Sequence, residues 1–171
     1  MRPIRAIPED AVYDEMNSPV GKLTLIASPK GLHAILWDIE RSSETYKKNL
    51  KGLVKAGDHK IILQTQKQLM EYFAGQRKNF NLPLALNGTD FQIQAWKQLQ
   101  KIPYGKTISY GEQAEKIGDK KKARAVGMAN GCNPVSIVVP CHRVIGSNGK
   151  LVGFDGGLPY KQWLLEHEKA N

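Results

Sequence analysis

The residues with the clearest chemical potential are a cysteine, a histidine and an arginine in succession, Cys141, His142 and Arg143. A cysteine with an ordinary pKa of about 8.5 is only a few per cent thiolate at neutral pH, so a reactive one needs a nearby base or positive charge. Adjacent side chains of an extended segment point to opposite faces, so His142 would not lie directly against Cys141. We therefore expect a sharp turn here or a relay through a bound water. The alternative is a buried, inert cysteine in a core strand.

The composition favours an intracellular protein with a polyanionic partner. The chain has 171 residues, 41% of them hydrophobic, which is enough for the core of one domain or two small lobes. Its 25 lysines and arginines exceed 16 acidic residues, and the net charge of +9 points most simply to nucleic acid. Cys132 and Cys141 form no disulfide framework, which fits a reducing cytosol.

Several classes of protein and site are not expected. The four histidines and two cysteines lack the spacing of zinc ligands, so we predict no metal and no cofactor. No stretch has the length and apolar character of a signal peptide or a membrane span. We expect a cytoplasmic protein with no membrane partner.

The first half of the chain predicts a small sheet with helices. Alternating apolar and polar positions over residues 11–37, interrupted by turn residues, predict three antiparallel strands. A short helix is expected within residues 38–58, and an amphipathic helix over residues 60–76 that ends at Gly75. Residues 79–87 read as a last strand or a linker.

The second half predicts a mostly helical lobe that begins near Gly88. Thr89 can cap a helix. Two short helical stretches follow, residues 109–117 and 121–131, and the tight turn between them contains Gly118. This arrangement resembles a helix-turn-helix, although the packing of small helices explains it as well. We therefore predict an α/β (α+β) protein with an N-terminal α/β lobe, residues 1–87, and a C-terminal lobe, residues 88–171.

The second of these two helices favours binding to a nucleic acid backbone. Lysines crowd its start, and its body carries small residues such as Ala123 and Gly127 in place of long side chains that read base edges. Small side chains permit close approach, and lysines contact phosphates, so binding without sequence preference is expected. A small helix buried against its neighbour is the alternative.

The remaining elements bring further residues toward the cysteine. Asn133 and Pro134 end the helix, and we expect a strand from there into Cys141. The glycine-rich segment 146–157 can form the wall or lid of a pocket. Pro159 suits the first turn of a last helix, from which Glu168 could fold back to orient His142; a solvated glutamate is the alternative.

These residues together resemble a known family. The run from Asn133 to Val144, Asn-Pro-Val-Ser-Ile-Val-Val-Pro-Cys-His-Arg-Val, is similar to the active-site signature of the O6-alkylguanine-DNA alkyltransferases, the methylated-DNA–protein-cysteine methyltransferases. The resemblance covers about residues 69 to 168. It also includes Gly88-Thr89-Asp90-Phe91-Gln92, Ile102-Pro103-Tyr104-Gly105, Ser109-Tyr110-Gly111, Ala123-Arg124-Ala125-Val126-Gly127, Gly156-Gly157 and Leu164-Leu165-Glu166-His167-Glu168. It implies a structural, RNase H-like N-terminal lobe and a C-terminal lobe for DNA binding and alkyl transfer.

The resemblance implies a role for each residue of the catalytic site. Cys141 would accept the alkyl group, His142 would act as a base through a water, and Glu168 would orient the imidazole. Asn133 would hold the turn before the cysteine. Tyr110 would donate a hydrogen bond to the guanine ring.

The resemblance also implies how DNA is held. Arg124 would replace the extruded base in the stack. The other residues expected at the DNA are Tyr110, Lys121, Lys122, Ala123, Gly127 and Asn130. Val144, Phe154 and Asp155 would line the base pocket. Family members often carry Ser or Ala at the position of Asp155, so the aspartate departs from the pattern.

The implied activity is single-turnover DNA repair. A monomer would bind double-stranded DNA without sequence preference and take an alkyl group from O6-alkylguanine, with O4-alkylthymine as a further candidate. The product thioether has a poor leaving group, so each molecule would act once. The alternatives are a Cys-His hydrolase, a helix-turn-helix regulator that senses alkylation, and a lesion-binding protein without catalysis.

Overall fold

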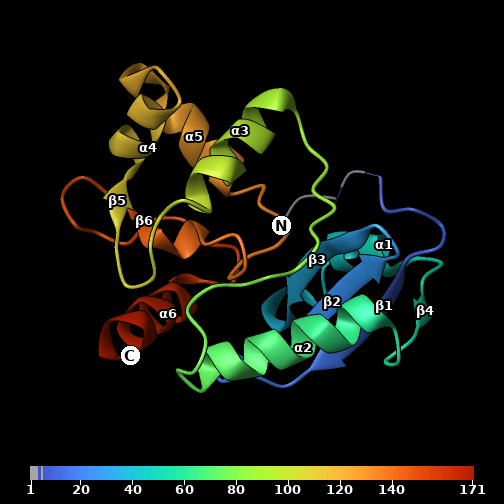
Figure 1. Cartoon of the computed structure of the whole chain (residues 1–171). Coiled ribbons are helices and arrows are strands. Elements are labelled where there is room, and N and C mark those ends of the chain that lie inside the picture. Colours follow the sequence, from blue (N-terminus) through green and yellow to red (C-terminus); the bar gives the residue numbers. More distant parts are fainter. Residues whose placement is uncertain (1–3, 5) are drawn as a thin grey trace. The chain divides into compact units, whose positions relative to one another are not determined.

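The chain divides into two compact units, with the division between Asn87 and Gly88 (Figure 1). The computed structural model describes Ile4 and residues 6–171. None of the described helices is both long enough and apolar enough to cross a membrane.

The first unit is built on a four-stranded sheet in the order β3-β2-β1-β4. The strands are β1 (Val12–Met16), β2 (Leu23–Ser28), β3 (Gly31–Trp37) and β4 (Val54–Lys55). β1, β2 and β3 pair antiparallel, which confirms the predicted meander, and β4 runs parallel to β1. β4 was not predicted, because two residues carry no detectable alternation.

Helices and an extended segment complete this unit. The helices are η1 (Asp38–Glu40), α1 (Glu44–Leu50) and α2 (Lys60–Phe73). α2 lies across the sheet in Figure 1 and buries Ile62, Leu69 and Tyr72 on one face. Leu32 of β3 exchanges backbone hydrogen bonds with the carbonyl of Pro83 and the N–H of Ala85, at 2.8 and 2.9 Å. The segment 79–87 thus makes a single bridge beside the free edge of β3, where it satisfies groups that would otherwise be open to pairing.

The second unit is mostly helical. Its elements are α3 (Asp90–Leu99), β5 (Ile108–Ser109), α4 (Tyr110–Lys116), η2 (Lys120–Lys122), α5 (Ala123–Asn130), η3 (Cys141–Arg143), β6 (Val144–Ile145) and α6 (Leu158–Ala170). α3 and α4 both begin with a capping box, formed by Thr89 with Gln92 and by Ser109 with Glu112. In Figure 1 the group α3, α4 and α5 lies on one side of η3 and α6 lies on the other.

Buried hydrogen bonds join α3, α4 and α5 in addition to apolar packing. The indole N–H of Trp96 donates to the carbonyl of Ala129 at 2.9 Å. The amide of Gln113 donates to the carbonyl of Ala95, and the amides of Gln113 and Asn130 donate to each other at 3.0 and 2.7 Å. Satisfied buried amides specify one arrangement of the three helices, because an unpaired amide there would be costly. α4, the turn at Gly118 and α5 form the helix-turn-helix.

The strand expected between Asn133 and Cys141 is absent. These residues form turns, with a single bridge between Ser136 and Val139, and Ile137 has a positive φ of 76°. The prediction was wrong because β-branched residues are favoured wherever a segment is buried, and Ile137 and Val139 are completely buried without a neighbouring strand.

Candidate active site

A tight turn presents Cys141. Pro140 has φ −83° and ψ 67°, and the N–H of Cys141 donates to the carbonyl of Val139 at 2.9 Å. These values define an inverse γ-turn, which proline favours because its φ is already restricted. The N–H of Arg143 then donates to the carbonyl of Pro140 at 3.1 Å, which closes a 3₁₀ turn over Cys141–Arg143. The backbone direction therefore reverses at the cysteine.

Asn133 supports this turn from the end of α5. Its amide nitrogen donates to the carbonyl of Val139 at 2.7 Å, and its amide oxygen accepts from the N–H of Val135 at 3.1 Å. Ile137 lies inside the loop so held, and a left-handed conformation at a β-branched residue is strained by about 1 to 3 kcal/mol. The buried contacts and the Asn133 bonds hold the loop in this strained form.

Cys141 lies at a cavity of about 110 Å³ within the second unit. Its side chain is only 8% exposed, so the cavity is its route to a substrate. The lining residues come from α4, α5, the turn after α5 and the glycine-rich loop: Tyr110, Gly127, Asn130, Gly131, Ser136, Cys141, Gly153, Phe154 and Asp155.

The surroundings of Cys141 favour the protonated thiol in the resting protein. Burial raises its pKa above the ordinary value and outweighs the opposing effects of hydrogen bonds from Asn133 and Ser136 and of the positive charge of Lys161. The charge of Asp155 raises the pKa further. A base is therefore needed when this sulfur reacts.

His142, Arg143 and Glu168 form a buried network. Nε2 of His142 lies 2.6 Å from Oε1 of Glu168. Arg143 donates through Nε and Nη2 to both carboxylate oxygens, at 2.9 and 3.0 Å, and through Nη1 to the carbonyl of Ile102 at 2.6 Å. Burial alone would raise the pKa of Glu168, but its hydrogen bonds and opposite charges hold that pKa well below the ordinary range.

The same network determines the state of the imidazole. Burial lowers the pKa of His142, and Glu168 opposes this only in part. A neutral imidazole that donates Nε2–H to Glu168 carries its free lone pair on Nδ1. Nδ1 is buried, and no group among the described residues is its hydrogen-bond partner. Nδ1 of a neutral His142 is thus a buried acceptor nitrogen.

Lys161 is a residue of this site that the sequence analysis missed. It is completely buried, and its ammonium donates to the carbonyls of Val144 and Val152 at 2.7 and 2.9 Å and approaches the hydroxyl of Tyr110 at 3.5 Å. The signal was its position on α6, because Lys161, Leu164 and Glu168 share one helical face, and that face is buried. A lysine on such a face is unusual and marks a specific role.

Tyr110 is held at the cavity in its protonated form. Its hydroxyl donates to the carbonyl of Val152 at 2.9 Å. Burial, and then the neighbouring charge of Cys141, raise the pKa of Tyr110 to about 12. The phenol therefore remains a hydrogen-bond donor throughout the physiological pH range.

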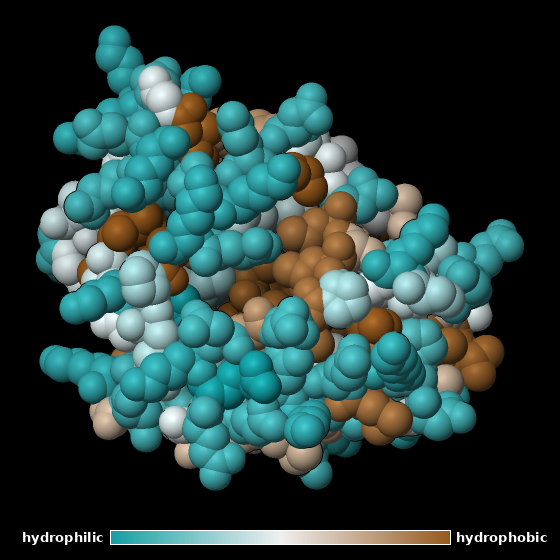
Figure 2. Space-filling model, in the orientation of Figure 1, coloured by the Kyte–Doolittle hydropathy of each residue, from teal (hydrophilic) through white to brown (hydrophobic). Residues whose placement is uncertain are grey.

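The residues predicted to bind DNA do not all fit that role. Lys121, Lys122 and Arg124 are exposed on η2 and α5, and the surface over α4 and α5 is mostly hydrophilic in Figure 2. Ala123 and Gly127 are partly exposed on the same helix. The amide of Asn130 is instead paired with that of Gln113 and is not free for DNA. An isolated sequence does not show this pairing, because Gln113 lies on another helix.

Two of the three predicted pocket residues line the cavity, and the third does not. Phe154 and Asp155 line the cavity. Val144 is completely buried in β6, where it pairs with Ile108, and its carbonyl accepts from Lys161. Val144 is therefore not among the residues that line the cavity.

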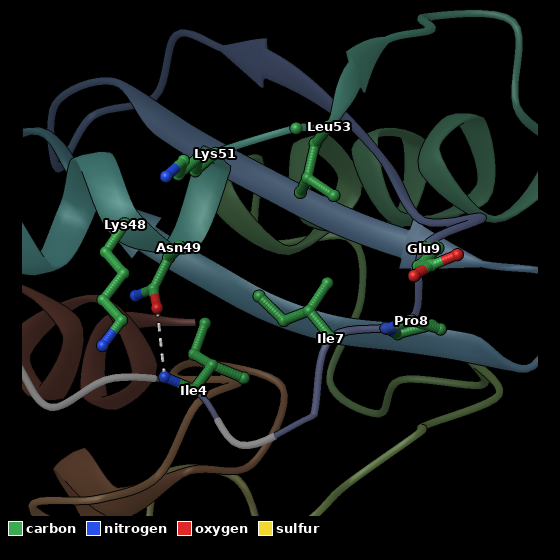
Figure 3. Close-up of a pocket in the computed structure, with 9 residues that line it drawn as sticks. Ile4, Ile7, Pro8, Glu9, Lys48, Asn49, Lys51 and Leu53 are labelled. Carbon is green, nitrogen blue, oxygen red and sulfur yellow. Dashed lines mark hydrogen bonds between the residues drawn. The ribbon is translucent and has the colours of Figure 1, made fainter.

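A second cavity, in the first unit, lacks comparable chemistry. It measures about 290 Å³ and is lined by residues that include Ile4, Ile7, Leu53, Lys48 and Lys51 (Figure 3). Among its described lining residues there is no cysteine, serine or histidine. Within the described part of the chain, no three His, Cys, Asp or Glu side chains are grouped as metal ligands would be.

Comparison with protein families matches both units. Residues 11–86 match the model described as 6-O-methylguanine DNA methyltransferase, ribonuclease-like domain, and residues 90–170 match the model described as 6-O-methylguanine DNA methyltransferase, DNA binding domain.

Individual relatives match over nearly the whole chain. The methylated-DNA–protein-cysteine methyltransferase of Mycolicibacterium paratuberculosis is 46% identical over 159 residues, which cover 93% of each chain. That of Methanosarcina acetivorans is 41% identical over 91% of this chain and 97% of its own. The crystal structure of the Mycobacterium tuberculosis enzyme in complex with DNA superposes with a TM-score of 0.82 at 45% identity and covers 92% of each chain.

Proposed function

Because the chain belongs to the methylated-DNA–protein-cysteine methyltransferase family, it is a DNA repair enzyme, and we propose that Cys141 takes the alkyl group from O6-alkylguanine in double-stranded DNA. The observation that carries the assignment is that Cys141 lies at the cavity while the next residue, His142, is buried with its Nε2 2.6 Å from Oε1 of Glu168. Cys132, the other cysteine, does not line this cavity.

The substrate must leave the duplex to reach this sulfur. An alkyl group on a stacked base cannot approach a thiol that is 8% exposed, so the nucleotide is rotated into the cavity, at a cost of a few kcal/mol. Arg124, exposed on α5, would fill the space left in the stack. The exposed lysines of η2 would hold the phosphates by charge alone, which gives binding without sequence preference.

Proton removal from Cys141 begins the chemical step. A water between Sγ and Nδ1 of His142 would carry the thiol proton to the imidazole, whose Nδ1 is a buried acceptor. Glu168 keeps Nε2–H oriented and stabilises the imidazolium that forms. Arg143 holds Glu168 ionised so that it does not take the proton itself.

The thiolate then displaces guanine from the alkyl carbon. A bond forms between Sγ and the carbon with a sulfur lone pair, and the bond from carbon to O6 breaks with its electron pair remaining on the base. Tyr110, which stays protonated, would turn its single O–H from the carbonyl of Val152 to the ring and donate a hydrogen bond as this charge develops. Overall the thiol proton is transferred to guanine, and the protein retains a thioether. The thioether sulfur is a poor leaving group, so the product is stable and each molecule acts once.

The site is complete within one chain. All lining residues of the cavity come from the unit Gly88–Asn171, so we propose that the protein acts as a monomer. A free, reduced Cys141 is required for activity, which supports a cytoplasmic location. A lesion-binding protein without catalysis would need neither a reactive cysteine nor a base beside it.

Intact-mass measurement tests the assignment. We expect the protein to gain about 14 Da after incubation with an O6-methylguanine duplex, the mass of one methyl replacing a hydrogen, and peptide mapping should place it on Cys141. Cys132→Ser is the matched control and should gain the same mass. Absence of the gain in folded protein, or a gain that persists in Cys141→Ser, would refute the assignment.

A further inference from the structure

Asp155 introduces a negative charge at the reacting centre. It lies on the loop between β6 and α6, is half-buried, and lines the cavity with Cys141. The family resemblance implies Ser or Ala at this position, so the aspartate adds a charge that the expected pattern lacks.

The negative charge of Asp155 raises the pKa of the Cys141 thiol. Burial is the largest cause of the raised pKa of Cys141, and the charge of Asp155 acts in the same direction. The positive charge of Lys161 acts on Cys141 in the opposite direction, and its ammonium is also held by the carbonyls of Val144 and Val152. The carboxylate therefore influences charges that develop or arrive beside Sγ.

The transferred alkyl group has to enter the cavity that Asp155 lines. During displacement the alkyl carbon lies between Sγ and O6 of the base, and any substituent on that carbon must fit near the cavity of about 110 Å³. Charges a few ångströms apart in a site partly shielded from water interact much more strongly than in bulk solvent. The sign of charge on the alkyl group should thus affect the rate.

We propose that Asp155 is a specificity-determining residue that makes the protein discriminate against alkyl groups carrying a carboxylate, relative to neutral alkyl groups of the same size. This proposal rests on the proposed alkyl transfer to Cys141 and names the class of adduct that the site prefers. The chemical step is unchanged: Sγ forms a bond to the methylene carbon, the bond from that carbon to O6 breaks, and the proton of the thiol is transferred to guanine.

Removal of the charge of Asp155, combined with substrates that differ only in charge, tests the proposal. The probes are duplexes with O6-carboxymethylguanine and O6-carbamoylmethylguanine, whose groups are nearly equal in size and differ by one negative charge. Single-turnover rates are measured for the full chain and for Asp155→Asn, which removes the charge with little change of shape. Asp90→Asn, an exposed aspartate in the first turn of α3, is the matched control.

The expected result is a change in the ratio of the two rates. The unaltered protein should react faster with the carbamoylmethyl adduct, and Asp155→Asn should reduce that preference by about tenfold, the size expected for one repulsive charge pair near a site of reduced dielectric. Asp90→Asn should leave the ratio unchanged. Intrinsic differences in reactivity between the adducts cancel in this comparison.

Two results would overturn the proposal. One is an equal ratio for the unaltered protein and Asp155→Asn, and the other is a ratio that changes as much in Asp90→Asn. A second variant, Asp155→Ser, must reproduce the effect of Asp155→Asn, which separates loss of charge from a local folding defect. Failure of the unaltered protein to accept even a methyl group would reject the alkyl-transfer assignment itself, and is distinct from methyl transfer with no discrimination by charge.

Discussion

Burial lowers the pKa of His142, and the sharing of its carboxylate partner with Arg143 acts in the same direction. An imidazole paired alone with a buried glutamate would be stabilised as the cation. Here Glu168 is already neutralised by the two hydrogen bonds from Arg143, and the guanidinium also opposes a second positive charge on His142. His142 therefore remains neutral, which is the state that the proposed proton abstraction requires.

The buried histidine should make the second unit sensitive to mild acid. The pKa of His142 is lowered below its ordinary value of 6.5 on folding, so below that pH the unfolded chain binds a proton that the folded chain does not. Stability should therefore fall as the pH decreases from about 6.5, and the depressed pKa of Glu168 should add a further loss below its ordinary value of 4.5. Urea unfolding at pH 7.5 and 5.5 measures the first effect.

His142→Asn isolates this contribution. We expect its stability to change less between the two pH values than that of the unaltered protein, whatever its stability at pH 7.5. The pH dependence of stability in His33→Asn gives the corresponding comparison for the first unit, where burial also lowers the pKa of His33. If His142→Asn shows the same or a steeper decline toward pH 5.5, the neutral state inferred for His142 is wrong.

Arg124 should matter only when a base has to be extruded. We expect Arg124→Ala to slow repair of an O6-methylguanine duplex by about tenfold or more, because the vacated stack is no longer filled, and to affect reaction with the free alkylated base much less. Rates of Cys141 alkylation by mass spectrometry measure both. Lys116→Ala, exposed on α4, is the control. Equal losses on the two substrates would contradict the insertion of Arg124.

Among the elements, η3 and α6 are joined by the guanidinium of Arg143. It contacts Glu168 of α6 and the carbonyl of Ile102, just beyond α3, while its own backbone belongs to the turn that carries Cys141. One side chain thus connects three parts of the second unit. Its removal would leave the carboxylate of Glu168 buried without its main counter-charge.

Arg143→Met should destabilise the second unit strongly. Removal of one partner of a buried ion pair lowers the free energy of unfolding by about 3 to 5 kcal/mol. Methionine retains most of the apolar volume of the arginine side chain. Chemical denaturation followed by tryptophan fluorescence measures the loss. Lys169→Met, at an exposed position of α6, should change stability by less than about 0.5 kcal/mol. A loss below about 1 kcal/mol in Arg143→Met would show that water reaches Glu168.

At the scale of the whole molecule, the excess of positive charge supplies affinity for DNA. The net charge is +9, and the lysines of η2 together with Arg124 place part of it beside the helix-turn-helix. Phosphate contacts release counterions, so binding should weaken as salt rises, with a slope of about 0.9 per contact on logarithmic axes. Repair in concentrated salt should be limited by binding.

Charge-removing substitutions test this distribution. Lys121→Gln and Lys122→Gln should each reduce the salt slope by about one and weaken binding equally for different sequences. Lys47→Gln, on α1 of the first unit, is the control and should leave the slope unchanged. Fluorescence anisotropy with a labelled duplex over a range of salt concentrations measures the slopes. Unchanged slopes in Lys121→Gln and Lys122→Gln would place the DNA elsewhere.

Much of the architecture could be predicted because it depends on local pattern. Alternation over residues 11–37 produced the three antiparallel strands, and Thr89 marked the start of α3 through its side-chain cap. The sequence around Cys141 and His142, through its resemblance to a known family, also predicted the reactive residue that lies at the cavity. These signals depend only on residues that are close together in the sequence, so the sequence alone contains them.

The tertiary structure alone decided which side chains face one another. A turn at Pro140 stands where a strand was expected, the amide of Asn130 is paired with that of Gln113, and Val144 is buried outside the lining of the cavity. The burial of Lys161 and the double hydrogen bond from Arg143 to Glu168 likewise join residues far apart in sequence. The order of residues determined which reactive side chains are present and where most helices lie. The protonation states of those side chains were set by burial and by partners far away in sequence, because both depend on the groups that folding brings into contact.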